Sequence, residues 1–209
     1  MKEFSANNFK NIIFDLGGVI LNIDYNLTID AFKKLGIEDF RNIYSKAQQG
    51  TLFDDFETGK SSPGQFIESV LHFTGKFISR ERIIAAWNAM LLDLPKERID
   101  LLITLRKKHR IFLLSNTNAI HYQSFSDYLL NTFGISDLKS VLEKQYLSFE
   151  VGMRKPDREI FDLVINENRI EPSETLFIDD SIQHVEGAKK AGINAFHLSG
   201  QTTIIDIFK

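Results

Sequence analysis

The sequence predicts an α/β protein built on a parallel sheet, and three observations lead to that prediction. Short apolar runs recur at residues 12–14, 111–114 and 176–178. Continuous runs of this kind are typical of strands buried on both faces of a parallel sheet. In the second half of the chain these runs alternate with segments of helical periodicity, which implies right-handed crossovers. A short polar cluster also follows each run directly.

The first strand is expected at residues 11–16, followed by a glycine turn at Gly17-Gly18. From residue 25 to residue 92 the pattern becomes helical, and Ser62-Pro63 is typical of a helix start. A crossover between parallel strands normally needs one helix. We therefore expect a separate helical unit here, although the helices could instead simply cover the core. They are expected at residues 27–35, 39–48, 62–73 and 79–90.

After Pro95 the alternation of strands and helices returns, and Gly192 is expected to end the last helix. Four further strands complete the predicted sheet, and a helix precedes or follows each of them. The strands are expected at residues 110–114, 146–148, 175–178 and 193–197, and the helices at residues 96–108, 119–131, 157–168 and 181–191.

Composition narrows the functional class. A chain of 209 residues suits one core domain with a modest insertion, and 43% hydrophobic residues with 18 Phe supply a packed interior. The net charge of −3 and the lack of a basic run argue against nucleic-acid binding. The chain has no cysteine, signal-peptide pattern or apolar run of membrane-spanning length. We therefore expect a cytoplasmic protein with no membrane partner, as a monomer or weak homodimer.

The polar clusters that end the apolar runs predict a site for anionic chemistry. In open α/β sheets the ligand crevice lies just beyond the carboxyl ends of the strands, so clusters distant in sequence meet there. A loop lysine adds a positive charge, and the combination favours phosphate. The clusters are Asp15, Ser115-Asn116, Lys155 and Asp179-Asp180.

Each cluster has both a functional and a purely structural interpretation. Asp15 is the candidate nucleophile, with the amides of Gly17 and Gly18 directed at phosphate oxygens. Alternatively, Asp15 only ends a strand before a turn. Ser115 and Asn116 precede a helix, where they either cap it or bind phosphate.

The lysine and the acidic pair also leave two interpretations. Lys155 either contributes charge to the site or is an exposed loop lysine. Asp179 and Asp180 either cap the following helix or hold a cation, and their mutual repulsion favours the cation. Oxygen ligands beside a phosphate suit Mg²⁺. His184 and His197 are expected at the edge of the core rather than on a metal.

The strings FDLGGVI, LSNTN, MRKPD and FIDD, in this order, resemble the haloacid dehalogenase superfamily of aspartate-nucleophile hydrolases. They are most similar to its small bacterial sugar-phosphate phosphatases, including the glucose-1-phosphate type. The resemblance implies a Rossmann-like core at residues 1–24 and 93–209 and a helical cap at residues 25–92. It further implies a set of roles: Asp15 as nucleophile, Ser115 and Asn116 with Gly17 and Gly18 binding substrate, Lys155 steadying the charge, Asp15, Asp180 and the Gly17 carbonyl holding Mg²⁺, and Asp179 orienting the metal or bonding to Lys155.

The expected activity is therefore Mg²⁺-dependent hydrolysis of a small phosphorylated metabolite through an aspartyl-phosphate. The chain departs from many family phosphatases at Gly17, where they carry a second Asp as general acid and base. Its loss predicts a slow enzyme or a good leaving group, such as a sugar-1-phosphate, because general acid–base catalysis contributes roughly 10²–10⁴-fold. Asn22 or Asp24 could replace it. In the cap, Glu57 is a candidate partner for sugar hydroxyls or part of a solvated loop.

Two other functions remain open from the sequence. A 2-haloacid dehalogenase uses the same Asp nucleophile and also lacks the second Asp. It needs no magnesium and usually lacks the paired acidic residues, so Asp179-Asp180 weighs against it. A non-catalytic binding module on the same fold is the third possibility, and the intact set of clusters weighs against that.

Overall fold

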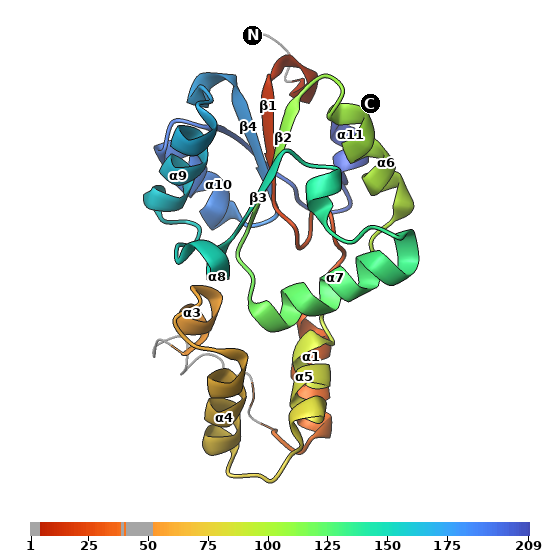
Figure 1. Ribbon diagram of the computed structural model, residues 1–209, viewed down its shortest axis with the longest axis vertical. Helices are drawn as coiled ribbons and strands as arrows, with labels where there is room; N and C mark the ends of the chain where they lie inside the picture. The colour runs from red at the N-terminus through yellow and green to blue at the C-terminus, as the bar shows by residue number, and fades with distance from the viewer. Residues whose placement is uncertain (1–4, 39, 41–51) are drawn as a thin grey trace.

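The computed structural model describes residues 5–38, 40 and 52–209 of the chain. A five-stranded sheet lies at one end of the molecule, and a group of helices lies at the other (Figure 1). The strands are β1 (Asn11–Phe14), β2 (Arg110–Ser115), β3 (Lys144–Leu147), β4 (Thr175–Asp179) and β5 (Asn194–His197). The α-helices are α1 (Tyr25–Lys34), α3 (Leu52–Glu57), α4 (Pro63–Thr74), α5 (Arg80–Asn88), α6 (Lys96–Leu105), α7 (Ala119–Phe133), α8 (Ser148–Val151), α9 (Arg158–Asn168), α10 (Ile182–Lys190) and α11 (Ile204–Ile207).

The sheet has the order β3-β2-β1-β4-β5, and all four strand pairs are parallel. The predicted α/β class is therefore confirmed. The first strand lies at the centre, with Phe14 beside Leu113 of β2 on one side and Ile178 of β4 on the other. This register brings the carboxyl ends of three strands together, so the residues that follow them lie at one edge of the sheet.

Helices cover both faces of the sheet and make three layers (Figure 1). Successive strand residues point to opposite faces. Ile12 and Phe14 pack with α6, α7 and α11 on one face, whereas Ile13 packs with α9 and α10 on the other. Burial on both faces explains why the strands are continuous apolar runs rather than alternating ones.

The helices α1, α3, α4 and α5 form a separate group below the carboxyl edge of the sheet, which we call the helical unit (Figure 1). It has its own apolar cluster, rich in aromatic rings. Phe66 stacks on Phe56 with the ring centroids 4.2 Å apart, and Phe53 stacks on Trp87 at 5.5 Å. The many Phe residues therefore build a second core in addition to the one around the sheet.

The chain passes between the sheet and the helical unit twice, and the two passages lie side by side. Ile23 and Leu91 form an antiparallel bridge, and the Asn22 amide donates to the carbonyl of Asp93 at 2.9 Å. The Leu92 amide returns a hydrogen bond to the carbonyl of Asn22 at 3.0 Å. These paired segments tie the helical unit to the sheet close to the carboxyl end of β1.

Several helix boundaries follow the expected signals, and some elements were missed. Ser62 caps α4 in a capping box with Gln65. The helix predicted at residues 39–48 lies outside the described residues, apart from Phe40. The short helices α3, α8 and α11 were not predicted, because segments of four to six residues carry too little periodicity.

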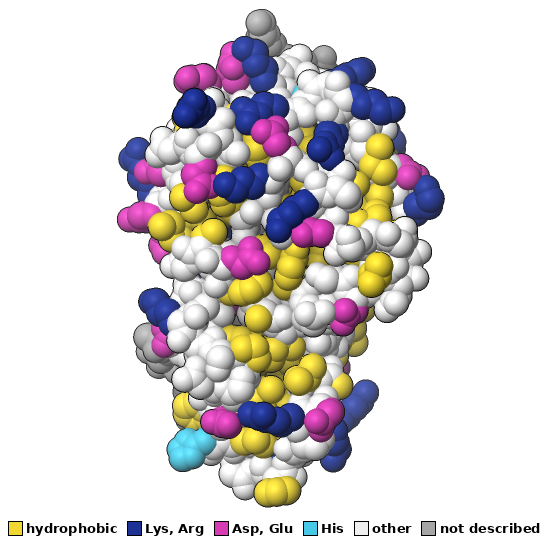
Figure 2. Space-filling model, viewed as in Figure 1, with side chains coloured by type: hydrophobic (Ala, Val, Ile, Leu, Met, Phe, Trp, Pro, Cys, Tyr) yellow, Lys and Arg dark blue, Asp and Glu magenta, His cyan; other side chains and the backbone are white. Residues whose placement is uncertain are grey.

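Charged side chains of both signs are interspersed over the face of the sheet domain in view (Figure 2). Among the described residues, no helix has the length and apolar character needed to cross a membrane.

Candidate active site

The polar clusters meet in a cavity of about 440 Å³ at the carboxyl edge of the sheet. Asp15 follows β1, Ser115 ends β2 and Asp180 follows β4, so three neighbouring strands each deliver one side chain. Part of the cavity wall comes from the helical unit and the segment after α5, through Tyr25, Glu57 and Met90. The other lining residues are Leu16, Gly17, Leu21, Ile23, Leu91, Asn116, Thr117, His121, Arg154, Ser181 and His184.

Lys155 lies beneath this cavity and is completely buried. Its Nζ atom lies 2.9 Å from Asp15 Oδ1 and 2.6 Å from Asp179 Oδ2, and it donates to the Leu114 carbonyl at 2.9 Å. All three N–H donors of the ammonium thus have an acceptor nearby. The interpretation of Lys155 as an exposed loop lysine is therefore wrong, because the side chain neutralises two buried carboxylates.

The pKa values of Asp15 and Asp179 are shifted in opposite directions. Burial raises the pKa of Asp15, and Lys155 lowers it only in part, because Asp179 adds a second negative charge. Burial also acts to raise the pKa of Asp179, but Lys155 and His184 lower it well below its usual range. Asp179 is therefore the permanent anion that holds the lysine in place.

The side chain of Asn116 is already used by the loop that carries Lys155. Its Nδ2 donates to the Lys155 carbonyl at 2.8 Å, and its Oδ1 accepts from the Lys155 amide at 2.9 Å. This double contact fixes the backbone of Lys155. The side-chain amide of Asn116 is therefore occupied rather than free for a ligand. Ser115 is 2% exposed at the end of β2 and lines the cavity directly.

The two glycines after Asp15 differ in their surroundings. Gly18 has a φ of +73°, and a Cβ there would lie 2.1 Å from Asp180 Oδ2. Its left-handed backbone therefore lies directly against the carboxylate of Asp180. Gly17 has no such φ, and its Cβ would meet the side chain of Ile23, whose Cδ1 atom is nearest at 3.0 Å. The turn thus requires glycine at position 18 and has room for a small adjustment at position 17.

The residues after β4 connect the acidic pair to two histidines. His184 Nδ1 lies 3.0 Å from Asp179 Oδ1, and His184 lines the cavity. The sequence placed this residue only at the edge of the core and did not predict that it contributes to the site. His197 Nε2 lies 3.0 Å from the Asp180 carbonyl. Burial, followed by the charge of Asp179, raises the pKa of Asp180.

The donor set fits a divalent cation. Asp15 and Asp180 both face the cavity, and the charge of Lys155 is shared between Asp15 and Asp179. Among the described residues Asp180 forms no salt bridge, so it adds negative charge to the cavity that Lys155 offsets only at a distance. Carboxylate and carbonyl oxygens are the ligands that Mg²⁺ prefers. Another combination, Asp15, Asp179 and His184, brings its ligand atoms within 4.8 Å of one another, but the two Asp179 oxygens already accept from the Lys155 ammonium and the Ser181 amide.

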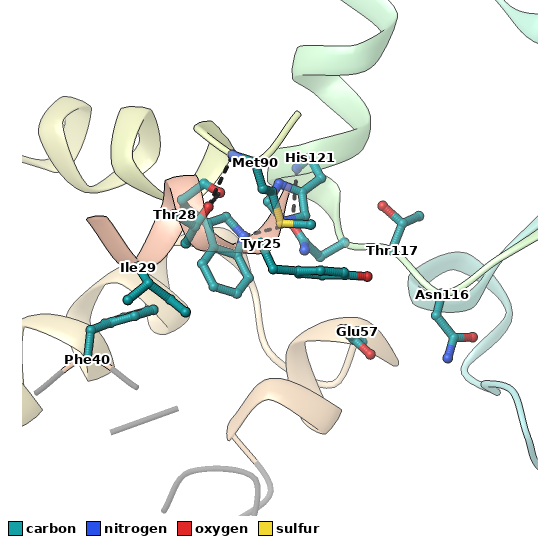
Figure 3. A pocket seen from close by; sticks show the side chains of 11 residues that line it. Tyr25, Thr28, Ile29, Phe40, Glu57, Met90, Asn116, Thr117 and His121 are labelled. Carbon is teal, nitrogen blue, oxygen red and sulfur yellow. Dashed lines mark hydrogen bonds between the residues drawn. The ribbon is translucent and has the colours of Figure 1, made fainter. Parts of the chain in front are cut away.

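A second cavity of about 350 Å³ shares part of its lining with the first and extends into the helical unit. Figure 3 shows the residues that line it. Tyr25 extends from α1 toward Thr117 and Asn116, and Glu57 lies at the end of α3 (Figure 3). The remaining wall is mainly apolar and aromatic. It consists of Thr28, Ile29, Phe40, Trp87, Met90, Asn118 and His121.

Sequence analysis missed several of these residues because no local motif marks them. His121 is buried in α7, with its ring stacked on Trp87 at 4.9 Å and its Nδ1 2.8 Å from Asn88 Oδ1. Burial lowers the pKa of His121 to about 3, so the ring is neutral. Trp87 packs in the core of the helical unit and also lines the second cavity.

Neither proposed replacement for the absent second Asp lines the cavities described here. Asn22 donates to Asp93 Oδ1 at 3.0 Å, next to the bridge between the two passages. Asp24 caps α1, where its Oδ1 accepts from the Asn26 amide at 2.9 Å. Both side chains therefore have structural partners away from Asp15.

The sequence and the fold were compared with those of known proteins. A model of the haloacid dehalogenase-like hydrolase family matches residues 9–192. A D-ribitol-5-phosphate phosphatase from Bacteroides thetaiotaomicron is 34% identical over 187 residues, which cover 90% of each chain.

Solved structures of similar length have the same fold. A HAD family enzyme from Bacteroides thetaiotaomicron, in complex with magnesium and inorganic phosphate, superposes with a TM-score of 0.86 and 37% identity. The match covers 96% of this chain and 100% of that one. A HAD-like family hydrolase from Porphyromonas gingivalis gives a TM-score of 0.84 and 30% identity over 95% of both chains.

Proposed function

Because the chain belongs to the haloacid dehalogenase-like hydrolase family, we propose that it is a Mg²⁺-dependent phosphomonoesterase acting through an aspartyl-phosphate on Asp15. One observation carries the proposal. A buried ammonium lies within 2.9 Å of Asp15 and 2.6 Å of Asp179, in a site where Asp180 adds a further carboxylate. This arrangement supplies a nucleophile, a fixed positive charge and oxygen ligands for a cation at one edge of the sheet.

In the first step an Asp15 carboxylate oxygen attacks phosphorus while the ester P–O bond breaks, and its electron pair stays with the leaving-group oxygen, which must then gain a proton. In the second step water attacks phosphorus, and the bond between phosphorus and Asp15 breaks. Lys155 holds Asp15 in place and offsets the charge that accumulates as the two anions approach. The Ser115 hydroxyl and the amide of Gly17 bind the phosphoryl oxygens, at the point where the strands end. The Gly18 amide, expected from the sequence to do the same, instead donates to the Leu21 carbonyl at 2.8 Å.

The metal is held by Asp15, Asp180 and the carbonyl of Gly17. When bound, Mg²⁺ neutralises phosphate charge so that an anionic nucleophile can approach. Gly18 leaves the space that the Asp180 carboxylate occupies, because a Cβ at position 18 would overlap that carboxylate. Asp179 does not ligate the metal in this account, since its oxygens already accept from Lys155 and the Ser181 amide. The choice of metal is supported by the 37% identical HAD family enzyme from Bacteroides thetaiotaomicron, whose structure contains magnesium and inorganic phosphate.

We further propose that residues 1–24 and 93–209 form the catalytic core and that residues 25–92 form a cap that selects the leaving group. The separate apolar cluster of the helical unit and the paired passages at Ile23 and Leu91 support this division. The second cavity, of about 350 Å³, is within the usual range for small ligands. The similarity to a D-ribitol-5-phosphate phosphatase favours a phosphorylated sugar or sugar alcohol as substrate.

The experiment is a screen of p-nitrophenyl phosphate, hexose-1-phosphates, hexose-6-phosphates and pentitol-5-phosphates with Mg²⁺ and with EDTA. We expect phosphate release that requires Mg²⁺ and includes at least one sugar or sugar-alcohol phosphate. The same plate includes 2-haloacids. Halide release without Mg²⁺ would identify a dehalogenase instead, and phosphate binding without turnover of any ester would identify a binding module.

A further inference from the structure

The proposed reaction lacks one component in the catalytic core. An alkoxide is a poor leaving group unless an acid protonates it as the P–O bond breaks. Gly17 has no side chain to do this, and Asn22 and Asp24 are engaged elsewhere. The acid must lie where the phosphate site meets the leaving-group site, because the ester oxygen belongs to both.

The junction between the two cavities identifies the candidates. Six residues line both cavities, and only three of them carry a side chain that can titrate. His121 is kept neutral by burial, with a pKa of about 3, and its Nδ1 contacts Asn88. Tyr25 and Glu57 remain, and a carboxylic acid is the stronger proton donor of the two. The shared residues are Tyr25, Glu57, Met90, Asn116, Thr117 and His121.

Glu57 has the surroundings that a proton donor needs. Its side chain is 23% exposed, and its Oε2 makes no hydrogen bond. Arg154 Nη2 lies 3.0 Å from that oxygen but is not aligned to donate to it. Burial raises the pKa of Glu57, and Asp54 raises it further, whereas Arg154 and Lys155 lower it. The balance of these groups favours the protonated form more than in an exposed glutamate.

The contacts of α3 also fix the position of Glu57 relative to the core. Arg154, directly before Lys155, forms ion pairs with both Asp54 and Glu57. The loop that carries the catalytic lysine therefore holds the last turn of α3 against the site. Glu57, although it belongs to the helical unit, is in this way held next to the loop that carries Lys155.

We propose that Glu57 is the general acid and base that replaces the aspartate absent at Gly17. This role rests on the proposed phosphatase function. As Asp15 forms its bond to phosphorus, the Glu57 carboxyl gives its proton to the ester oxygen and the neutral alcohol leaves. The Glu57 carboxylate then takes a proton from the water that attacks the aspartyl-phosphate. Free phosphate and the Asp15 carboxylate are released, and Glu57 is protonated again.

The test is a leaving-group series with wild type and Glu57→Gln, which keeps the shape of the side chain. The substrates are p-nitrophenyl phosphate, phenyl phosphate and butyl phosphate, none of which has a sugar hydroxyl. We expect kcat for butyl phosphate to fall roughly 10²–10⁴-fold, the usual contribution of a general acid. The leaving group of p-nitrophenyl phosphate departs without a proton, so a general acid does not speed its release. The rate of the first step for this substrate, measured in a single turnover, should therefore change less than about threefold.

Asp54→Asn is the matched control, because it also removes a carboxylate from Arg154 but does not line either cavity. Its leaving-group dependence should stay much closer to that of wild type than that of Glu57→Gln does, because loss of Asp54 only lowers the pKa of Glu57 and leaves the proton donor in place. An equal loss across all three substrates in Glu57→Gln would overturn the proposal, as would a loss confined to Tyr25→Phe. If wild type hydrolyses none of the esters with Mg²⁺, the phosphatase function itself fails, and that outcome is separate from the role of Glu57.

Discussion

Replacing Gly18 with alanine should damage the metal site more than the fold. The new Cβ would lie 2.1 Å from Asp180 Oδ2, so the carboxylate must move away from its present position. The φ of +73° adds about 1–2 kcal/mol of backbone strain for a residue with a Cβ. We expect that loss in the free energy of unfolding, together with a rise of about 10–100-fold in the Mg²⁺ concentration for half-maximal activity, the range found when a metal ligand loses its support.

The matched control is Gly17→Ala, one residue earlier in the same turn. Its Cβ would lie 3.0 Å from the flexible end of Ile23, and its backbone is not left-handed. We expect the free energy of unfolding to change by less than about 1 kcal/mol, because the close contact with Ile23 is offset by the roughly 0.4–1 kcal/mol that Gly→Ala contributes by restricting the unfolded chain. Urea unfolding and Mg²⁺ titration of p-nitrophenyl phosphate hydrolysis measure both effects. An unchanged Mg²⁺ titration in Gly18→Ala would refute the placement of Asp180 at the metal.

Three further outcomes follow from the site. Lys155→Met should lower the free energy of unfolding by about 3–5 kcal/mol, measured by urea unfolding, because two buried carboxylates lose their partner. Asp180→Asn should raise the Mg²⁺ requirement more than Asp179→Asn, and equal titration curves would contradict the assigned ligands. Gly17→Asp should restore butyl phosphate turnover in the Glu57→Gln background; a double variant as slow as Glu57→Gln would mean that position 17 does not reach the ester oxygen.

The sheet and the residues at its edge could be predicted because each signal is local. An apolar run that ends at Asp15 or at Asp179 identifies a strand and the residue that follows it, and parallel pairing brings such residues together. The buried state of Lys155 was open from the sequence, since only the fold places two carboxylates around its ammonium.

The helical part of the site could not be predicted in the same way. Glu57 lies at the end of a six-residue helix whose periodicity is too short to recognise, and its partner Arg154 is distant in sequence. The use of Asn116 as a clamp on the Lys155 backbone is likewise a tertiary contact. Sequence motifs therefore located the residues at the edge of the sheet, whereas the side chains that the helical unit adds to the cavities depend on how it packs against the core.

In the proposed reaction Asp15 becomes phosphorylated during turnover. The direct measurement is to quench the reacting enzyme with borohydride, which reduces an acyl phosphate to the alcohol, and to sequence the peptides by mass spectrometry. The account predicts homoserine at position 15, only when substrate and Mg²⁺ are present, and none in Asp15→Asn. Steady turnover with an unmodified Asp15, or reduction at another carboxyl group, would contradict it.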